Sequence, residues 1–276
     1  MPDATAKDGV RLHYESDGAG APIVFVHELA GTLHSFEPQV TAMKDRFRCI
    51  AYNARGYPPS DVPPSVESYS QDIAASDIAA VLDSCGLDSA HVMGVSMGAA
   101  AALQFALAYP ARARSVILCS IGSGSDVGTD AYAVETEARA QGVEKAGMAE
   151  AAKNFGNSPT RIRLKAKNPA LYESYLREVG KLSVLGLTNT LRGVQKRRPP
   201  LYAHEARVKA MKVPALVLVG ADDEPCLKPS RFLEANLPGA RLVVLPETGH
   251  GLNLEDPVLV NGLVSRFVAD VEARRS

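Results

Sequence analysis

Residues 91–102 read His91-Val92-Met93-Gly94-Val95-Ser96-Met97-Gly98-Ala99-Ala100-Ala101-Ala102. The first five form an apolar run typical of a buried strand, and the alanines open a helical segment that can lie close to a sheet. The Gly-x-Ser-x-Gly pattern marks a tight turn, in which Gly94 and Gly98 avoid side-chain clashes and the serine takes strained backbone angles. A plain strand-to-helix turn is the alternative, but this context favours a nucleophile at Ser96, beside the positive end of a helix dipole.

A serine hydroxyl is a poor nucleophile until a base removes its proton, and histidine is the usual base. The base must reach Ser96 from the same edge of the sheet, so we expect it on a loop that directly follows a strand. Of the six histidines, His250 fits best, because Thr248-Gly249-His250-Gly251 comes after the last apolar run. The flanking glycines give this loop the freedom to aim the ring.

The imidazole needs a carboxylate that fixes its tautomer and stabilises its charged form. The segment Gly220-Ala221-Asp222-Asp223-Glu224-Pro225 follows the penultimate apolar run and offers three acids. Any of them would give the chain order serine, acid, histidine. The residues alone leave the choice among these three acids open.

Short apolar runs alternate with longer helical segments along the chain. Residues 9–15 alternate with period two and predict an early antiparallel strand. Runs without alternation, typical of strands covered on both faces, follow at residues 23–26, 49–52, 91–95, 115–119, 215–219 and 241–245. Helices are expected at residues 68–85, 99–109 and 257–273. This order predicts an α/β fold with a mostly parallel central β-sheet flanked by helices.

Residues 122–207 contain no strand-like run and are divided by glycines and prolines into helical segments. We interpret them as a helical lid inserted into one α/β core formed by residues 1–121 and 208–276. Apolar residues at helical spacing predict the inner face of this lid: Leu171, Tyr175, Leu176, Val179 and Leu182. Residues 161–198 hold ten lysines and arginines against two acids. This charge indicates either a solvated helix face or attraction for an anionic substrate.

Composition excludes several classes of protein. The net charge is −1, so no overall field would hold nucleic acid or an anionic membrane. The most apolar stretch, around residues 93–103, is too short to span a bilayer. The four cysteines form no C-x-x-C pair, and two lie in apolar runs, which favours buried free thiols in a reducing compartment over disulfides. Their spacing also argues against a metal site. Residues 1–5 are polar and lack the features of a secretory signal. We therefore expect a cytoplasmic protein.

The chain resembles the α/β-hydrolase superfamily, and within it the branch of small esterases, lactonases and enol-lactonases. The likeness covers nearly the whole chain and is carried by residues 8–14, by residues 51–60 against a D-x-R-G-x-G-x-S segment, and by residues 249–255 against G-H-x-x-x-x-E. In that superfamily the acid lies three residues after the glycine that closes the strand. The resemblance therefore implies Asp223 as the acid, with Asp222 as the open alternative.

The resemblance also implies an oxyanion hole formed by the backbone N–H groups of Leu29 and Met97. Glu28 departs from the family pattern, because relatives carry His-Gly and then an apolar residue where this chain has His27-Glu28-Leu29. A carboxylate about 4 Å from the oxyanion would oppose it by about 4 kcal/mol at an effective dielectric near 20. We therefore expect Glu28 to turn away from the pocket and to be held by a cation or by backbone donors, with Arg55 as the candidate cation.

Two residues beside this hole stay candidates for the substrate pocket. The alternative for Glu28 is that it faces the substrate and handles specificity or a proton. We interpret His27 as a structural turn histidine, with a place in the pocket as its alternative.

These residues predict a serine hydrolase that cleaves a carboxylic ester or a lactone through an acyl-enzyme, with no cofactor and no metal. Carbon–carbon bond hydrolysis and cofactor-free haloperoxidase (perhydrolase) chemistry would use the same triad. Such haloperoxidases often place a tryptophan near the oxyanion hole, and this chain has none. A non-catalytic receptor on the same fold is a further alternative. The expected partner is a small ester or lactone, anionic if the basic lid steers it, and neither nucleic acid nor a membrane.

Overall fold

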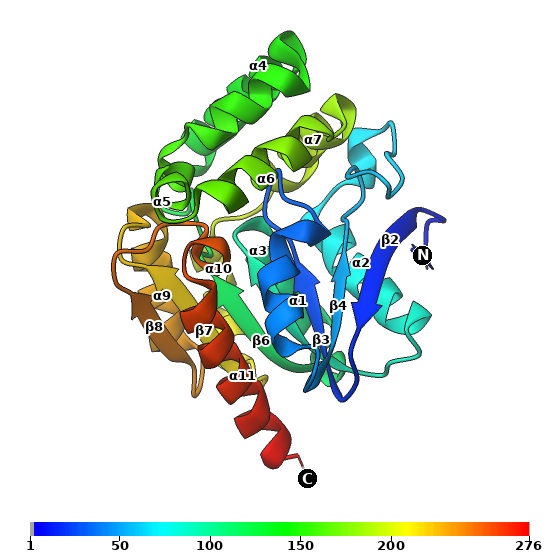
Figure 1. The fold of residues 1–276 in the computed structure, drawn as a ribbon, viewed down its shortest axis with the longest axis vertical. Helices are drawn as coiled ribbons and strands as arrows, with labels where there is room; N and C mark the ends of the chain where they lie inside the picture. The colour runs from blue at the N-terminus through cyan, green and yellow to red at the C-terminus, as the bar shows by residue number, and fades with distance from the viewer. Residues whose placement is uncertain (1–2, 276) are drawn as a thin grey trace.

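The computed structural model describes residues 3–275, which form a central sheet with helices on both faces and a helical layer above one edge (Figure 1). Within these residues the strands form an eight-stranded sheet of order β1-β2-β4-β3-β5-β6-β7-β8. The strands are β1 (Asp3–Thr5), β2 (Arg11–Asp17), β3 (Ala21–Val26), β4 (Phe47–Tyr52), β5 (Ala90–Val95), β6 (Ala113–Cys119), β7 (Ala215–Gly220) and β8 (Arg241–Leu245). Strands β3 to β8 pair in parallel, and β2 pairs antiparallel to β4. The mostly parallel sheet predicted from the sequence is therefore confirmed.

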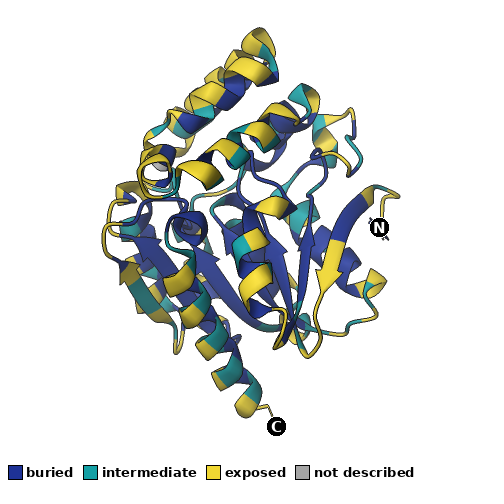
Figure 2. Cartoon of the chain, viewed as in Figure 1, coloured by how far each residue is buried: buried dark blue, intermediate teal, exposed yellow. Residues whose placement is uncertain are grey.

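Helices cover both faces of the sheet. The core helices are α1 (Glu37–Met43), α2 (Gln71–Ser84), α3 (Met97–Ala108), α8 (Glu205–Ala210), α9 (Glu224–Asn236), α10 (Leu252–Glu255) and α11 (Pro257–Ala273). One apolar cluster joins α1 and α11 to one face, and a second joins α2, α3, α8 and α9 to the other. Figure 2 shows the resulting pattern, in which strands β3 to β7 are largely buried, whereas β8 is partly exposed. Residues 241–245 are therefore not covered on both faces as predicted, because β8 is an edge strand of the sheet. Continuous apolar runs are the sequence mark of this two-sided burial.

A helical insertion between β6 and β7 lies above the carboxyl edge of the sheet (Figure 1). It contains α4 (Thr129–Gly156), α5 (Pro159–Lys167), α6 (Pro169–Gly180), α7 (Val184–Thr190) and a π-helical turn (Leu191–Gln195). Tyr175, Val179 and Leu182 pack in one cluster with Tyr57 and Met97 of the core. The apolar residues predicted for the inner face of the lid do face the core. No helix within residues 3–275 has the length and apolarity that crossing a membrane requires.

Candidate active site

Ser96 lies at the turn between β5 and α3, with φ 54° and ψ −111°. This positive φ is unusual for a residue with a side chain, and the crowded turn enforces it. A Cβ on Gly94 would lie 2.1 Å from the carbonyl oxygen of Gly98, and a Cβ on Gly98 would lie 2.0 Å from that of Val26. Only glycine fits at either position. The serine is half-buried at the carboxyl edge of the sheet, as its motif predicts.

Asp223 and His250 are hydrogen-bonded to each other behind this edge. His250 Nδ1 lies 2.9 Å from Asp223 Oδ2, and the two residues are only 8% and 3% exposed. Burial raises the pKa of Asp223, but the charge and the hydrogen bond of His250 outweigh it and hold this pKa below its usual value. The carboxylate is thus ionised at neutral pH and can orient the imidazole.

Asp222, the alternative acid, is exposed and points elsewhere. Its carboxylate pairs with Arg163 of α5 at 2.6 Å, and both side chains reach solvent. The structure therefore brings His250 together with Asp223 and not with Asp222. The family resemblance implied this choice, and the burial of Asp223 explains it physically.

Glu255 holds the loop that carries His250. Its carboxylate accepts hydrogen bonds from the backbone N–H groups of Gly249 at 2.5 Å and Gly251 at 3.0 Å. Burial raises the pKa of Glu255, and these two amides oppose the shift. The glutamate of the G-H-x-x-x-x-E pattern therefore fixes both residues that flank the histidine.

The turn after β3 comes close to the start of α3. Gly31 N–H donates to the Glu28 carbonyl at 2.9 Å, and Ala30 has φ 60°. A Cβ on Gly98 would also touch the His27 carbonyl, so α3 begins directly against this turn. Within the described residues, neither the Leu29 nor the Met97 backbone N–H has an acceptor. Two free donors on adjacent turns suit a developing oxyanion.

His27 has a structural place in this turn. Its Nδ1 lies 2.8 Å from the Glu28 carbonyl, and its Nε2 lies 3.0 Å from the Ala54 backbone nitrogen. The ring therefore donates through Nδ1 and accepts through Nε2, which requires the neutral tautomer. Burial lowers the pKa of His27 and favours the same form. His27 also lines a mostly apolar pocket together with Met97 and Tyr57.

Glu28 pairs with a cation, but Arg55 is the wrong partner. Arg161 of α5 approaches Glu28 Oε1 to 2.9 Å, and the two side chains are only 4% and 2% exposed. Arg55 instead binds Asp77 and Asp8, each at 2.7 Å. The strand ends that carry Arg55 and Glu28 are neighbours, as expected, but Asp77 of α2 occupies the guanidinium group. The cation for Glu28 comes from the lid.

Asp223, Cys226 and His250 offer three atoms within 4.8 Å of one another that could ligate a metal. Cys226 Sγ lies 3.8 Å from His250 Nδ1, the atom already bonded to Asp223. Burial, followed by the Asp223 charge, raises the pKa of the Cys226 thiol, which favours the protonated form over a metal-binding thiolate. This chemistry fits a carboxylate–imidazole pair better than a metal centre.

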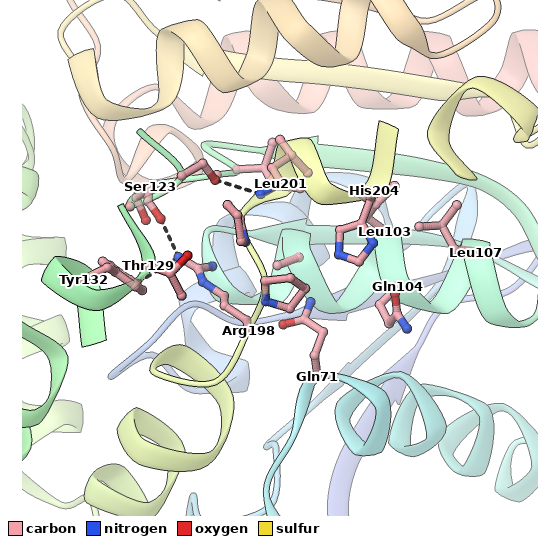
Figure 3. A pocket seen from close by; sticks show the side chains of 17 residues that line it. Gln71, Leu103, Gln104, Leu107, Ser123, Thr129, Tyr132, Arg198, Leu201 and His204 are labelled. Carbon is pink, nitrogen blue, oxygen red and sulfur yellow. Dashed lines mark hydrogen bonds between the residues drawn. The ribbon is translucent and has the colours of Figure 1, made fainter. Parts of the chain in front are cut away.

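A second pocket lies beside α3 and the two ends of the helical insertion (Figure 3). Its wall includes Ala100, one helical turn beyond Ser96, and the loop of residues 121–125 after β6. Arg198 closes one side by donating to the Ser123 carbonyl at 2.5 Å. Ser96, Asp223 and His250 do not line it. This cavity therefore carries no part of the candidate site.

Comparison with known proteins agrees with this geometry. Residues 21–257 match the family described as alpha/beta hydrolase fold, and the chain belongs to that family. It is 27% identical to a putative 2-succinyl-6-hydroxy-2,4-cyclohexadiene-1-carboxylate synthase of Bacillus subtilis, over 97% of this chain and 98% of that protein. It is 25% identical to 3-oxoadipate enol-lactonase 1 of Acinetobacter baylyi, over 97% of both chains. A hydrolase from Pseudomonas aeruginosa superimposes with a TM-score of 0.84 at 25% identity, over 97% of both chains.

Proposed function

We propose that this protein is a serine hydrolase that cleaves a carboxylic ester or a lactone through an acyl-enzyme. The observation that carries the proposal is the strained Ser96 at the carboxyl end of β5, on the edge where the buried Asp223–His250 pair follows β7 and β8. Parallel strands bring these ends to one edge of the sheet. The family to which the chain belongs supports hydrolysis as the general chemistry.

Each step uses a group of this chain. Ser96 Oγ attacks the substrate carbonyl while His250 Nε2 takes its proton, and Asp223 stabilises the imidazolium. The Leu29 and Met97 amides hold the negative oxygen of the tetrahedral intermediate. His250 then gives the proton to the departing alcohol or to the ring oxygen of a lactone. A water molecule activated by His250 releases the acid and restores Ser96.

The helical insertion, its charged side chains and the cysteines bear on the substrate and on the location of the protein. We propose that residues 122–207 act as a lid over one α/β core of residues 1–121 and 208–276. Several of the basic side chains in this segment form ion pairs with nearby acids. Arg192 and Lys196 pair with Glu137, and Arg197 pairs with Glu67. These pairs favour a neutral substrate over an anionic one. The free thiols of all four cysteines accord with a cytoplasmic location.

Ser96→Ala tests the proposal in an assay with p-nitrophenyl acetate and butyrate. We expect kcat to fall by several powers of ten, because removing the nucleophile of a triad has that effect in other hydrolases. Ser265→Ala on α11 is the control and should keep wild-type activity. A Ser96→Ala variant that retains more than about a tenth of the activity would remove the serine mechanism, and a wild-type protein without turnover would favour a receptor.

A further inference from the structure

The Glu28–Arg161 pair connects two parts of the molecule that are far apart in sequence. Glu28 belongs to the turn that presents the Leu29 amide, and Arg161 belongs to α5 of the lid. The ion pair measures 2.9 Å and is almost fully buried. The Arg161 guanidinium carbon also lies 4.6 Å from the centre of the Tyr175 ring on α6. A lid helix therefore supplies a cation to the loop of the proposed oxyanion hole.

The carboxylate of Glu28 lies within its own turn. A Cβ on Gly31 would be 2.6 Å from Glu28 Oε2, so the side chain folds back over the residue that closes the turn. Glu28 Oε2 is buried and bonds to no residue of the described chain. Among residues 3–275, Arg161 is the cation in ion-pair contact with Glu28. Without that contact, a buried negative charge would remain one residue from Leu29.

Such a charge would act directly on the chemistry proposed above. The tetrahedral intermediate carries a negative oxygen at the Leu29 amide, and a neighbouring anion repels it in a poorly screened site. Arg161 cancels that field when the lid is closed on the core. The Glu28 carboxylate would therefore oppose catalysis when it is unpaired, and it would not when it is paired with Arg161.

We propose that Arg161 is a positioning residue that switches on the oxyanion hole by neutralising Glu28, so that only the closed lid gives a fully active site. The inference rests on the proposed hydrolase function. It assigns a role in turnover to a lid residue that need not touch the substrate. It also explains why an acid is tolerated at position 28.

Other ionisable groups surround the pair and belong in any account of its pH dependence. Glu255 on α10 and Tyr175 on α6 interact with Arg161, and Tyr57, from the loop after β4, and His27 interact with Glu28. Burial raises the pKa of Tyr57 and of Tyr175 and lowers that of His27, which favours the neutral form of all three. Glu255 keeps its two backbone donors in every variant described below.

A double-mutant cycle tests the switch with the ester assay. Arg161→Gln leaves Glu28 unpaired, and we expect kcat at pH 8.5 to fall at least tenfold, an order of magnitude set by one nearby charge. Glu28→Gln should keep kcat within about tenfold of wild type. The double variant should recover most of the loss, because neither charge remains. A merely structural Arg161 predicts the opposite, with equal or greater loss in the double variant.

The pH profile of Arg161→Gln gives a second readout. A buried carboxylate without its cation holds a proton more tightly, so its negative charge appears only as the pH rises. The ratio of variant to wild-type kcat should therefore fall from pH 6 to pH 9, and Glu28→Gln in the same background should flatten it. Dividing by the wild-type value removes the contribution of His250, which is common to both proteins.

Arg163→Gln is the matched control, because Arg163 lies on the same helix and ties it to the core through the exposed Asp222. It should keep wild-type kcat. If Arg161→Gln does not fold, Arg161→His gives the same test, since its cation is lost as the pH rises. A fall in kcat that Glu28→Gln fails to rescue, or no fall at all, would overturn the inference. Loss of wild-type turnover itself would instead count against the proposed function.

Discussion

At the scale of single residues, burial separates side chains that look equivalent in the sequence. Asp222 and Asp223 are adjacent acids on one loop, yet one pairs with Arg163 in solvent and the other with His250 in the interior. Glu28 and Glu255 are both buried acids near the candidate site. Glu28 pairs with the guanidinium group of Arg161, whereas Glu255 accepts hydrogen bonds from two backbone amides.

Asp223→Asn should lower kcat by orders of magnitude, because the imidazole would lose the charge that orients and stabilises it. Asp222→Asn removes only an exposed ion pair, whose worth is at most about 1 kcal/mol, and should change kcat by less than about threefold. Steady-state kinetics on both variants decide the point. The reverse ranking would move the acid of the triad by one residue.

The residues that sequence reasoning found are those whose motifs lie at strand ends. The strand–turn–helix context marks Ser96, and the glycine-flanked loop marks His250, because each pattern records a local backbone requirement. The partner of Glu28 leaves no such mark. Arg161 is distant in the chain and reaches Glu28 only through the docking of the lid, whereas Arg55 is close but bound by Asp77. Pairing across a lid depends on tertiary packing.

At the scale of elements, the continuous apolar runs predict the parallel strands well. Several other elements escape detection, among them β1, α1 and α9. Strand β1 has only three residues, and α1 is a short helix that follows a 3-10 turn. Helix α9 contains Pro229 and begins at the acidic loop, where the residues indicate a turn. Short length and an internal proline weaken the periodic signal on which such predictions depend.

The packing of β5 against β6 and α11 contains a buried histidine that should make stability depend on pH. His91 Nδ1 lies 2.7 Å from Ser115 Oγ, and Nε2 lies 3.2 Å from Glu272 Oε1. Burial lowers the pKa of His91 to about 4, with Arg114 lowering it further and Glu272 opposing. Because the unfolded chain binds this proton near pH 6.5, its contribution is complete above pH 6.5 and is lost as the pH falls toward 4.

Chemical denaturation of wild type at pH 7.5 and pH 4.5 should show this loss, at most about 3 kcal/mol from His91. His91→Gln should reduce the difference between the two pH values, whatever its own stability. The comparison therefore uses the change in the free energy of unfolding between the two pH values, and not its value at one pH. An unchanged slope in the variant would assign the acid sensitivity to other groups.

At the scale of the whole molecule, the residues of the candidate site lie at the carboxyl edge of the sheet. The turns after β3, β5, β7 and β8 lie at this edge and carry the free amides, the strained serine, the acid and the histidine. The helical insertion between β6 and β7 lies above this edge, with an apolar face toward the core and a buried cation on α5. In the mechanism that we propose, the core provides the reacting groups and α5 provides the cation that pairs with Glu28.

Labelling with a fluorophosphonate, followed by mass mapping of the modified peptide, tests the central claim most directly. An activated serine reacts with such a probe, and an ordinary serine does not. We expect a single adduct on Ser96 in the wild-type protein, strongly reduced labelling in His250→Ala, and none in Ser96→Ala. An unlabelled wild-type protein, or an adduct on another residue, would contradict the account.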